Sequence, residues 1–296
     1  MRSAISGRAK VATLWENLKK SLWLDWRTLR CGGLPRSVRM ALIVEKWIAI
    51  GSLAVRHQFA MGIHSTSRYH GTTVSELGVL QSCIVDVYDE LVTTGIASQV
   101  RRAIDVGANC GQWTTAFKLF AKHAEVHALE PDPDTYRTLT RNLARLVNVS
   151  AYNVAAGASN GMGLLYRHEL SVMSSQYPAN QKGYDMANPI RTPVRRLDDV
   201  LDTVVDLIKI DVEGAEGEVI KGATRLLGQA RYLVVEVALW PGGGEPALGV
   251  LSQIESVRPG SHIVKFGRPL GSPRRPLRQD VVIRLGDGKG PLSLTS

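Results

Sequence analysis

The chain has 296 residues, of which 44% are hydrophobic and 21% are charged, and its formal net charge is +9. The apolar fraction excludes wholesale disorder, and the length suits one large domain or two small ones. Cys31, Cys83 and Cys110 are too few and too scattered for a disulfide framework or a structural zinc site, and they fit a reducing, cytoplasmic setting.

Charge is distributed unevenly along the chain. Residues 1–60 contain eleven Lys and Arg against three Asp and Glu, and residues 261–296 contain seven against two. Residues 61–260 therefore hold the remaining 18 basic and 22 acidic side chains, a net charge of −4. A basic protein often binds nucleic acid, but the motifs that carry chemistry lie in this acidic middle, so we expect no nucleic-acid partner.

The first predicted element is an amphipathic helix that ends before Gly32 and Gly33. Its apolar stripe recurs at three- and four-residue steps and consists of Trp15, Leu18, Leu22, Trp26 and Leu29. A second apolar stretch, residues 38–55, is interrupted by charges and is too short to span a bilayer, which needs about 20 apolar residues. The first fifteen residues lack the continuous apolar segment of a signal peptide.

Residues 1–75 are therefore predicted to be a basic helical N-terminal extension, for which three arrangements are open. In the first, a pair of helices caps the main domain and packs the tryptophan stripe inward. In the second, the helix lies on an anionic membrane surface, which would make the protein peripheral at the inner membrane face. In the third, the segment is poorly ordered.

From residue 102 onward, apolar runs typical of buried strands alternate with helical patterns. The predicted strands are residues 102–106, 125–129, 149–154, 207–210, 232–237, 262–266 and 280–285. The predicted helices are residues 113–122, 135–146, 216–227 and 247–257, and residues 157–196 are expected to be irregular. This alternation predicts an α/β fold with a doubly wound, mostly parallel sheet, in which the last two strands form a hairpin.

A glycine-rich turn follows the first of these strands. In the segment AIDVGANCGQW, Gly107 and Gly111 flank Asn109 and lead into a helix. Such a turn lets the backbone approach a ligand closely, although an ordinary strand–helix turn has the same composition. The full G-x-G-x-x-G pattern of dinucleotide binders is absent, which argues against an NAD(P)-dependent oxidoreductase.

An acidic residue ends the second strand, in the segment HALEPDPD. Glu130 lies where a carboxylate can accept hydrogen bonds from both hydroxyls of a ribose, and Pro131 and Pro133 shape the loop that follows. Both motifs map to the carboxyl ends of neighbouring strands. Together they predict a site for a nucleoside cofactor.

A third motif, DLIKIDVEGAE, places several charges around one strand end. Lys209 lies inside the strand, and Asp211, Glu213 and Glu216 follow it. Three acids at one place indicate a general base, a divalent-metal cluster or recognition of a cationic cofactor. Alternatively, an acid caps the following helix and Lys209 merely pairs with one of them.

These three motifs, with the RRLDDV segment before the third and VVEV after it, resemble the FkbM-type methyltransferases over residues 100–240. The resemblance implies a Rossmann-like class I methyltransferase domain, which we place at residues 76–290, with a seven-stranded sheet whose last strand is antiparallel. It also implies S-adenosyl-L-methionine as cofactor and O-methylation of sugar hydroxyls or polyketide-type products. The acceptor would be a small molecule, saccharide or glycolipid.

Carried over by position, the resemblance assigns roles to individual residues. The methionine part of the cofactor would be surrounded by Asp105, Gly107, Asn109 and Gly111. Glu130 would hold the ribose, and the adenine side would be approached by Asp132 and by the segment from Asn153 to Ala155. Pro131 is a further candidate for cofactor binding. Asp211 is the first candidate for the base and Glu213 the second, with Lys209 beside them. A divalent ion shared by the two acids is an alternative to which we do not commit, because no histidine stands beside them.

Acceptor specificity is expected to reside in residues 157–196. Candidate contacts there are Tyr166, His168, Ser174 and Tyr177. Competing functions are an RNA methyltransferase and a non-catalytic relic of the fold, and the sequence does not indicate the oligomeric state.

Overall fold

The structure is a computed structural model that describes residues 7–51, 59–62, 68–71, 74–168, 184–239, 245–272 and 275–286. Two of the candidate acceptor contacts, Ser174 and Tyr177, lie outside these ranges.

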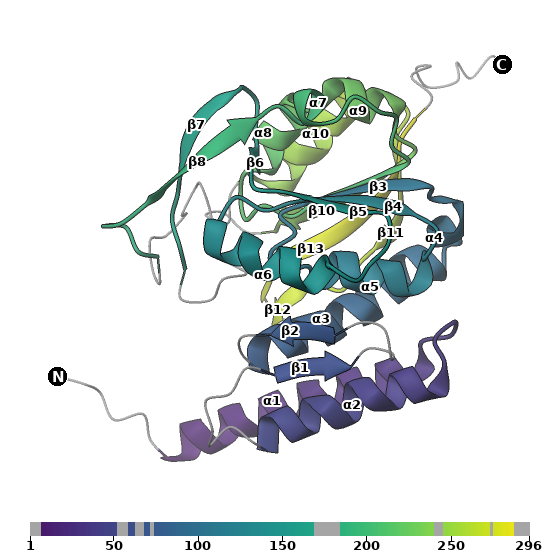
Figure 1. The fold of residues 1–296 in the computed structure, drawn as a ribbon, viewed down its shortest axis with the longest axis vertical. Helices are drawn as coiled ribbons and strands as arrows, with labels where there is room; N and C mark the ends of the chain where they lie inside the picture. Colours follow the sequence, from purple (N-terminus) through teal and green to yellow (C-terminus); the bar gives the residue numbers. More distant parts are fainter. Residues whose placement is uncertain are drawn as a thin grey trace.

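The central sheet has the strand order β11–β13–β10–β9–β3–β4–β5, and β12 pairs with β13 (Figure 1). Its strands are β3 (Arg102–Val106), β4 (Glu125–Leu129), β5 (Val149–Tyr152), β9 (Leu207–Ile210), β10 (Tyr232–Ala238), β11 (His262–Phe266), β12 (Leu270–Ser272) and β13 (Arg275–Arg284). β5, β4, β3, β9 and β10 are mutually parallel, whereas β13 runs antiparallel to β10 and β11. The predicted fold class is confirmed.

Strand order reverses between β3 and β9. The chain builds β3, β4 and β5 toward one edge of the sheet and then returns to place β9 and β10 on the other side of β3. In open α/β sheets such a switch point opens a crevice beyond the carboxyl ends of the strands, and ligands bind there. The three predicted motifs follow β3, β4 and β9, so the topology brings them to this crevice.

Helices cover both faces of the sheet (Figure 1). On one side lie α3 (Val74–Val87), η1 (Tyr88–Val92), α4 (Ile96–Gln99), α5 (Gln112–Phe120) and α6 (Pro133–Leu143). On the other lie α7 (Leu197–Val200), α8 (Glu216–Lys221), α9 (Thr224–Gln229) and α10 (Ala247–Val257). Successive residues of a strand point to opposite faces of the sheet and pack in two separate cores. Ala103 packs on the side of α3 and α5, and Ile104 packs on the side of α8–α10. Burial on both faces explains why these strands are continuous apolar runs.

Three local expectations are wrong. The single helix predicted at residues 216–227 is two helices, α8 and α9, which Gly222 and Ala223 separate. β13 begins at Arg275 rather than at residue 280, because it pairs with β10 out to Arg278, opposite Ala238, and with β12 at Pro276 and Arg275. The stretch 157–196 is not irregular in its described part: β6 (Ala155–Ala156), β7 (Gly161–Leu165) and β8 (Ile190–Arg195) form a second sheet, ordered β6–β8–β7. β7 is exposed along most of its length and therefore lacks the apolar pattern of a core strand.

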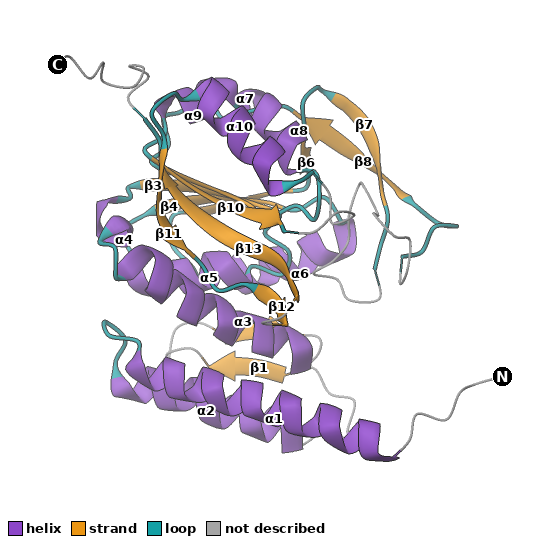
Figure 2. Ribbon diagram, turned by 180° about the vertical axis from the view of Figure 1, so that it is seen from behind, coloured by secondary structure: helices purple, strands orange, loops and turns teal. Residues whose placement is uncertain are grey.

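The predicted N-terminal helices are present as α1 (Gly7–Arg30) and α2 (Arg36–Gly51), followed by the hairpin of β1 (Phe59–Gly62) and β2 (Arg68–Gly71). Figure 2 shows α1 and α2 side by side as an outer layer beyond α3. The helices thus cap the domain, but the expected inward packing of the tryptophan stripe is wrong: Leu22, Trp26 and Leu29 are 53%, 46% and 45% exposed. No helix in the described ranges is both long and apolar enough to cross a membrane.

A polar cluster attaches α1 to its neighbours. The buried carboxylate of Asp25 accepts hydrogen bonds from Lys46, from Trp47 Nε1 at 2.7 Å and from Gln81 Nε2 at 2.9 Å. Gln81, on α3, also donates to Thr28 at 3.0 Å. Burial lowers the pKa of Lys46, and its hydrogen bond and ion pair with Asp25 oppose that shift. The N-terminal layer is therefore joined to the domain by a charge network within an apolar core.

We expect Asp25→Asn to lower the free energy of unfolding by about 3 kcal/mol, because it leaves the buried Lys46 ammonium without a counter-charge. The matched control is Glu218→Gln, which removes an exposed ion pair with Lys221 and should cost about 0.5 kcal/mol or less. Urea unfolding followed by tryptophan fluorescence measures both. Equal stability of the two variants would show that the cluster does not hold the layer in place.

Candidate active site

The glycine-rich turn after β3 requires glycine for two separate reasons. Gly107 has φ of 81°, and a Cβ built on it would lie 1.9 Å from the backbone oxygen of Asp211. Asn109 and Gly111 also have positive φ, 49° and 89°. The amides of Gly107 and Ala108 both donate to the Leu129 carbonyl, at 3.1 and 2.9 Å. The turn is thus packed against both neighbouring strand ends, an arrangement that no larger residue at position 107 would allow.

Glu130 lies buried at the end of β4, where both of its carboxylate oxygens accept backbone hydrogen bonds. Asn109 N donates to Oε2 and Asp132 N donates to Oε1, each at 2.9 Å. Burial raises the pKa of Glu130 to about 7 despite these bonds. Each oxygen has a second lone pair, so the group can still accept two hydroxyl donors.

The residues assigned to the adenine side have structural partners of their own. Asn153 donates to the carbonyls of Glu130 and Pro131, at 2.9 and 3.1 Å, and so fixes the turn that carries the carboxylate. Asp132 caps α6 and accepts a two-point contact from Arg167 at 2.6 and 2.7 Å. Ala155 is buried in β6. Direct contact of these side chains with a ligand stays a prediction.

Lys209 lies at the centre of the switch point. Its Nζ is 3.3 Å from Asp105 on β3 and 3.1 Å from Asp211 at the end of β9. Burial would lower the pKa of this ammonium, but the two carboxylates outweigh it and raise the pKa. Asp105 is fully buried and also accepts a 2.6 Å hydrogen bond from Thr114, whereas the Asp211 side chain is 33% exposed. The lysine therefore joins one buried acid to one that faces the crevice.

The turn after Asp211 holds Glu213 in a conformation that is unusual for a side chain of its size. Its φ is 56°, and Gly214 follows with φ of 108°. Glu216, the first residue of α8, closes the turn by accepting a hydrogen bond from Gly214 N at 2.9 Å. The alternative that Asp211 or Glu213 caps this helix is wrong, because the N-cap position is Ala215 and no side chain caps it. A strained residue in a crevice is a common mark of function.

Arg278 is a member of the site that the sequence motifs did not reveal. From β13, its Nη1 lies 2.6 Å from Glu213 and 2.8 Å from Glu236 at the end of β10. Burial raises the pKa of Glu213 to about 8, with Asp211 and Glu216 contributing and Arg278 opposing. The only sequence signal was a charge near the start of a predicted strand, because the pairing of β13 with β10 is not local.

A divalent metal at this site would have to bind among carboxylates that Arg278 already pairs with. Asp211, Glu213 and Glu236 each bring a carboxylate oxygen within 4.8 Å of the others, and hard cations prefer such oxygens. The Arg278 guanidinium already neutralises two of these three acids. A cation would therefore have to displace Arg278, and we derive no chemical step from a metal.

Further carboxylates lie behind the site, on α3, η1 and β13. Glu90 is buried beside Asp280, and burial together with Asp280 raises the pKa of Glu90 well above its usual value. Asp86 on α3 pairs with Arg268 at 3.3 Å. Burial, followed by the nearby Asp211 and Asp86, raises the pKa of Asp280 to about 7. The crevice therefore holds more acidic than basic groups among its described residues.

The described part of the 157–196 stretch reaches this crevice. His168 pairs with Tyr184 in an isolated bridge, and their rings pack edge to face at 4.8 Å. Burial raises the pKa of Tyr184, and the charge of Glu213 adds to this shift. Tyr184 was not among the predicted contacts, whereas His168 was.

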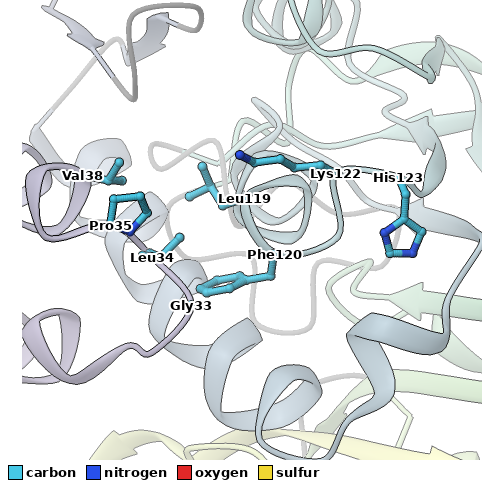
Figure 3. Close-up of a pocket in the computed structure, with 8 residues that line it drawn as sticks. All are labelled: Gly33, Leu34, Pro35, Val38, Leu119, Phe120, Lys122 and His123. Atoms are coloured by element: carbon cyan, nitrogen blue, oxygen red, sulfur yellow. The ribbon is translucent and has the colours of Figure 1, made fainter.

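A cavity of about 420 Å³ lies away from these residues. Figure 3 shows Leu34, just before α2, and Val38 of α2 on one side, with Phe120 at the end of α5 and His123 beyond it on the other. α5 ends where β4 begins, so this cavity opens at the amino edge of the sheet. The motifs lie at the carboxyl edge, and the cavity is not part of the candidate active site.

The region that carries these motifs matches a known protein family. The family model described as "Methyltransferase FkbM domain" matches residues 105–258, more than half of the chain. Methyltransferase sdnD of Sordaria araneosa is 31% identical over 188 residues, which cover 52% of this chain and 70% of that protein.

Two further relatives have names that specify a substrate or position. The 2-O-methyltransferase NoeI of Sinorhizobium fredii is 29% identical over 149 residues, covering 45% of this chain and 61% of that protein. The hexuronic acid methyltransferase AglP of Haloferax volcanii is 29% identical over 143 residues, covering 45% and 54%. The chain thus spans little more than half the length of these two relatives.

Among solved structures, methyltransferase FkbM from Methylobacillus flagellatus KT superposes with a TM-score of 0.44 at 18% identity, covering 70% of this chain and 59% of that one. The family model extends from Asp105 of the first motif through the acidic turn after β9. This chain belongs to the FkbM methyltransferase domain family.

Proposed function

We propose that the protein transfers a methyl group from S-adenosyl-L-methionine to a hydroxyl oxygen of a saccharide or another small molecule. The observation that carries the proposal is Glu130, a buried carboxylate with two backbone donors and two remaining acceptor positions at the switch point. A ribose diol supplies the two donors that this geometry lacks. Gly107, Gly111 and Asn109 form the close-approach turn beside it.

The charge of the crevice favours the same cofactor. S-adenosyl-L-methionine is a sulfonium cation that supplies an activated methyl group, and the surplus of carboxylates beyond β9 and β10 stabilises positive charge there. Asp105 and Asp211, joined by Lys209, lie on the β9 side of the turn where the methionine part would bind. Lys209 serves as a positioning residue in this arrangement.

Asp211 and Glu213 are the candidates for removing the hydroxyl proton. Asp211 faces the crevice and is held by Lys209, so its carboxylate can accept a hydrogen bond from the acceptor hydroxyl and orient it. The pKa of Glu213 is raised to about 8, so near neutral pH this carboxyl group retains the hydroxyl proton while the new carbon–oxygen bond forms. We keep Asp211 as the first candidate for the base and Glu213 as the second.

Two independent observations favour a sugar or another small ring-shaped molecule as the acceptor. NoeI is named a 2-O-methyltransferase and AglP a hexuronic acid methyltransferase, which favours a sugar hydroxyl for this chain as well. Tyr184 and His168 provide two rings that pack edge to face, and such a surface suits a small ring-shaped acceptor better than an RNA duplex. A glycolipid carrying the sugar fits the same site.

Replacing Glu130 with Ala should weaken S-adenosylhomocysteine binding by on the order of tenfold to a hundredfold, since two hydrogen bonds to a charged group are lost. Calorimetric titration of the folded variant measures this affinity. Glu125→Gln, at the other end of the same strand, is the control and should bind as the wild type does. Unchanged affinity in Glu130→Ala would place the nucleoside elsewhere.

Asp211→Asn should reduce kcat by on the order of 10²–10⁴ while cofactor affinity stays close to that of the wild type, because the amide keeps the shape but cannot take a proton. Methyl transfer is measured with a labelled donor and saccharide extracts, and Asp199→Asn on the surface is the control. Normal turnover of Asp211→Asn would exclude this residue as the base.

The pH dependence separates Glu213 from Asp211. A carboxylate acts as a base only when ionised, so with Glu213 in that role kcat/KM should rise with pH and level off above about 8. In Glu213→Gln that limb should disappear together with most of the activity. A wild-type profile that is flat through this range would assign the proton transfer to Asp211. Activity abolished by a chelator and restored by Mg²⁺ would instead support the metal alternative.

A further inference from the structure

The outer surface of α1 and α2 concentrates exposed apolar side chains. The described chain has sixteen exposed large hydrophobic residues, and six of them lie between residues 22 and 44. They are Leu22, Trp23, Trp26, Leu29, Met40 and Val44, and each is at least 39% exposed. The Trp23 ring lies against Arg268 of the domain, 5.0 Å from its guanidinium, so we call the other five residues the apolar outer face. Isolated exposed hydrophobics need no explanation, but such a concentration on one layer indicates a binding surface.

Helix α1 buries polar residues and exposes apolar ones, which is the reverse of the usual arrangement in a surface helix. Asp25 and Thr28 are buried against α3, whereas Trp26 and Leu29 point to solvent. A helix that only caps a core buries its apolar stripe. α2 by contrast buries Val38 and Leu42 in the core, and of the described side chains of α1 Leu24 packs against that core. The hydrogen bonds of Asp25 hold α1 in this orientation, which leaves Trp26 and Leu29 available to a partner.

Basic side chains surround the apolar outer face. Lys19, Lys20, Arg30 and Arg36 are exposed, and the Arg30 guanidinium lies 3.9 Å from the centre of the Trp26 ring. Between residues 18 and 44 the single acidic residue is Asp25, which is buried. The exposed residues of this segment therefore carry positive charge only.

The apolar and basic side chains of this surface together favour one kind of partner. A second copy of the chain would bring two positively charged surfaces together, which like-charge repulsion opposes. An anionic bilayer supplies negative headgroups for the lysines and arginines and an interfacial layer for tryptophan and leucine. We propose that the α1–α2 layer binds peripherally to an anionic lipid surface through the apolar outer face and its basic border. The proposal does not depend on the methyl-transfer chemistry.

Sedimentation of the full chain with vesicles tests the proposal. The chain should bind vesicles of phosphatidylcholine mixed with phosphatidylglycerol, bind pure phosphatidylcholine weakly, and dissociate as salt is added. Trp26→Ser combined with Leu29→Ser should abolish most of the binding. The control is Leu248→Ser on α10, an 82% exposed leucine on the other face of the sheet, which should bind as the wild type does.

Charge is tested separately. Lys20→Glu combined with Arg30→Glu should weaken binding to the mixed vesicles by on the order of twentyfold or more, since each basic residue near such a surface contributes roughly fivefold. Arg141→Glu combined with Arg145→Glu, at the end of α6 and beyond it, is the control with the same change in net charge. Circular dichroism confirms that each variant is folded.

Three results would overturn the proposal. The first is absence of binding to the mixed vesicles by the folded wild type. The second is equal binding by the wild type and both outer-face variants. The third is a dimer in sedimentation velocity that dissociates on Trp26→Ser and Leu29→Ser, which would make the face a contact between copies of the chain.

Discussion

The site depends on a buried ammonium group between two carboxylates. Lys209 lies between Asp105 of β3 and Asp211 of β9, where the strand order reverses. A lysine this buried is tolerated only with counter-charges nearby, and each carboxylate likewise depends on the lysine. The three groups therefore fix the ends of the two strands relative to each other. Gly107 allows this closeness, because its missing side chain leaves room for the Asp211 carbonyl.

The rest of the crevice extends this charge arrangement outward. Glu213 and Glu236 share Arg278, and Asp280 and Glu90 add further carboxylates behind them. A buried acid without full compensation has a raised pKa, and here several lie together. Such a site stabilises an incoming cation, and it holds groups that exchange protons near neutral pH. Both properties suit a sulfonium donor and a hydroxyl acceptor.

The contact of the N-terminal layer with the domain differs between its two helices. α2 buries Val38 and Leu42 in the core, whereas α1 buries Asp25 and Thr28 and exposes Trp26 and Leu29. A buried polar contact is geometrically demanding, because each donor needs its acceptor in a defined direction. Asp25, Lys46 and Gln81 therefore determine which side of α1 faces the domain. Hydrophobicity alone would have selected the other side.

The sequence by itself determined the sheet, its mostly parallel order, the antiparallel last strand and the position of Glu130, because apolar strand runs and strand-end motifs are local signals. It did not determine which face of α1 is buried, where β13 begins, or that Arg278 reaches Glu213. These features arise from contacts between residues far apart in the chain. Helical periodicity shows that α1 has two faces, but the charge on Asp25 and its distant partner Gln81 decide which face is buried. Arg278 enters the site only through the register of β13 on β10, which no local pattern encodes.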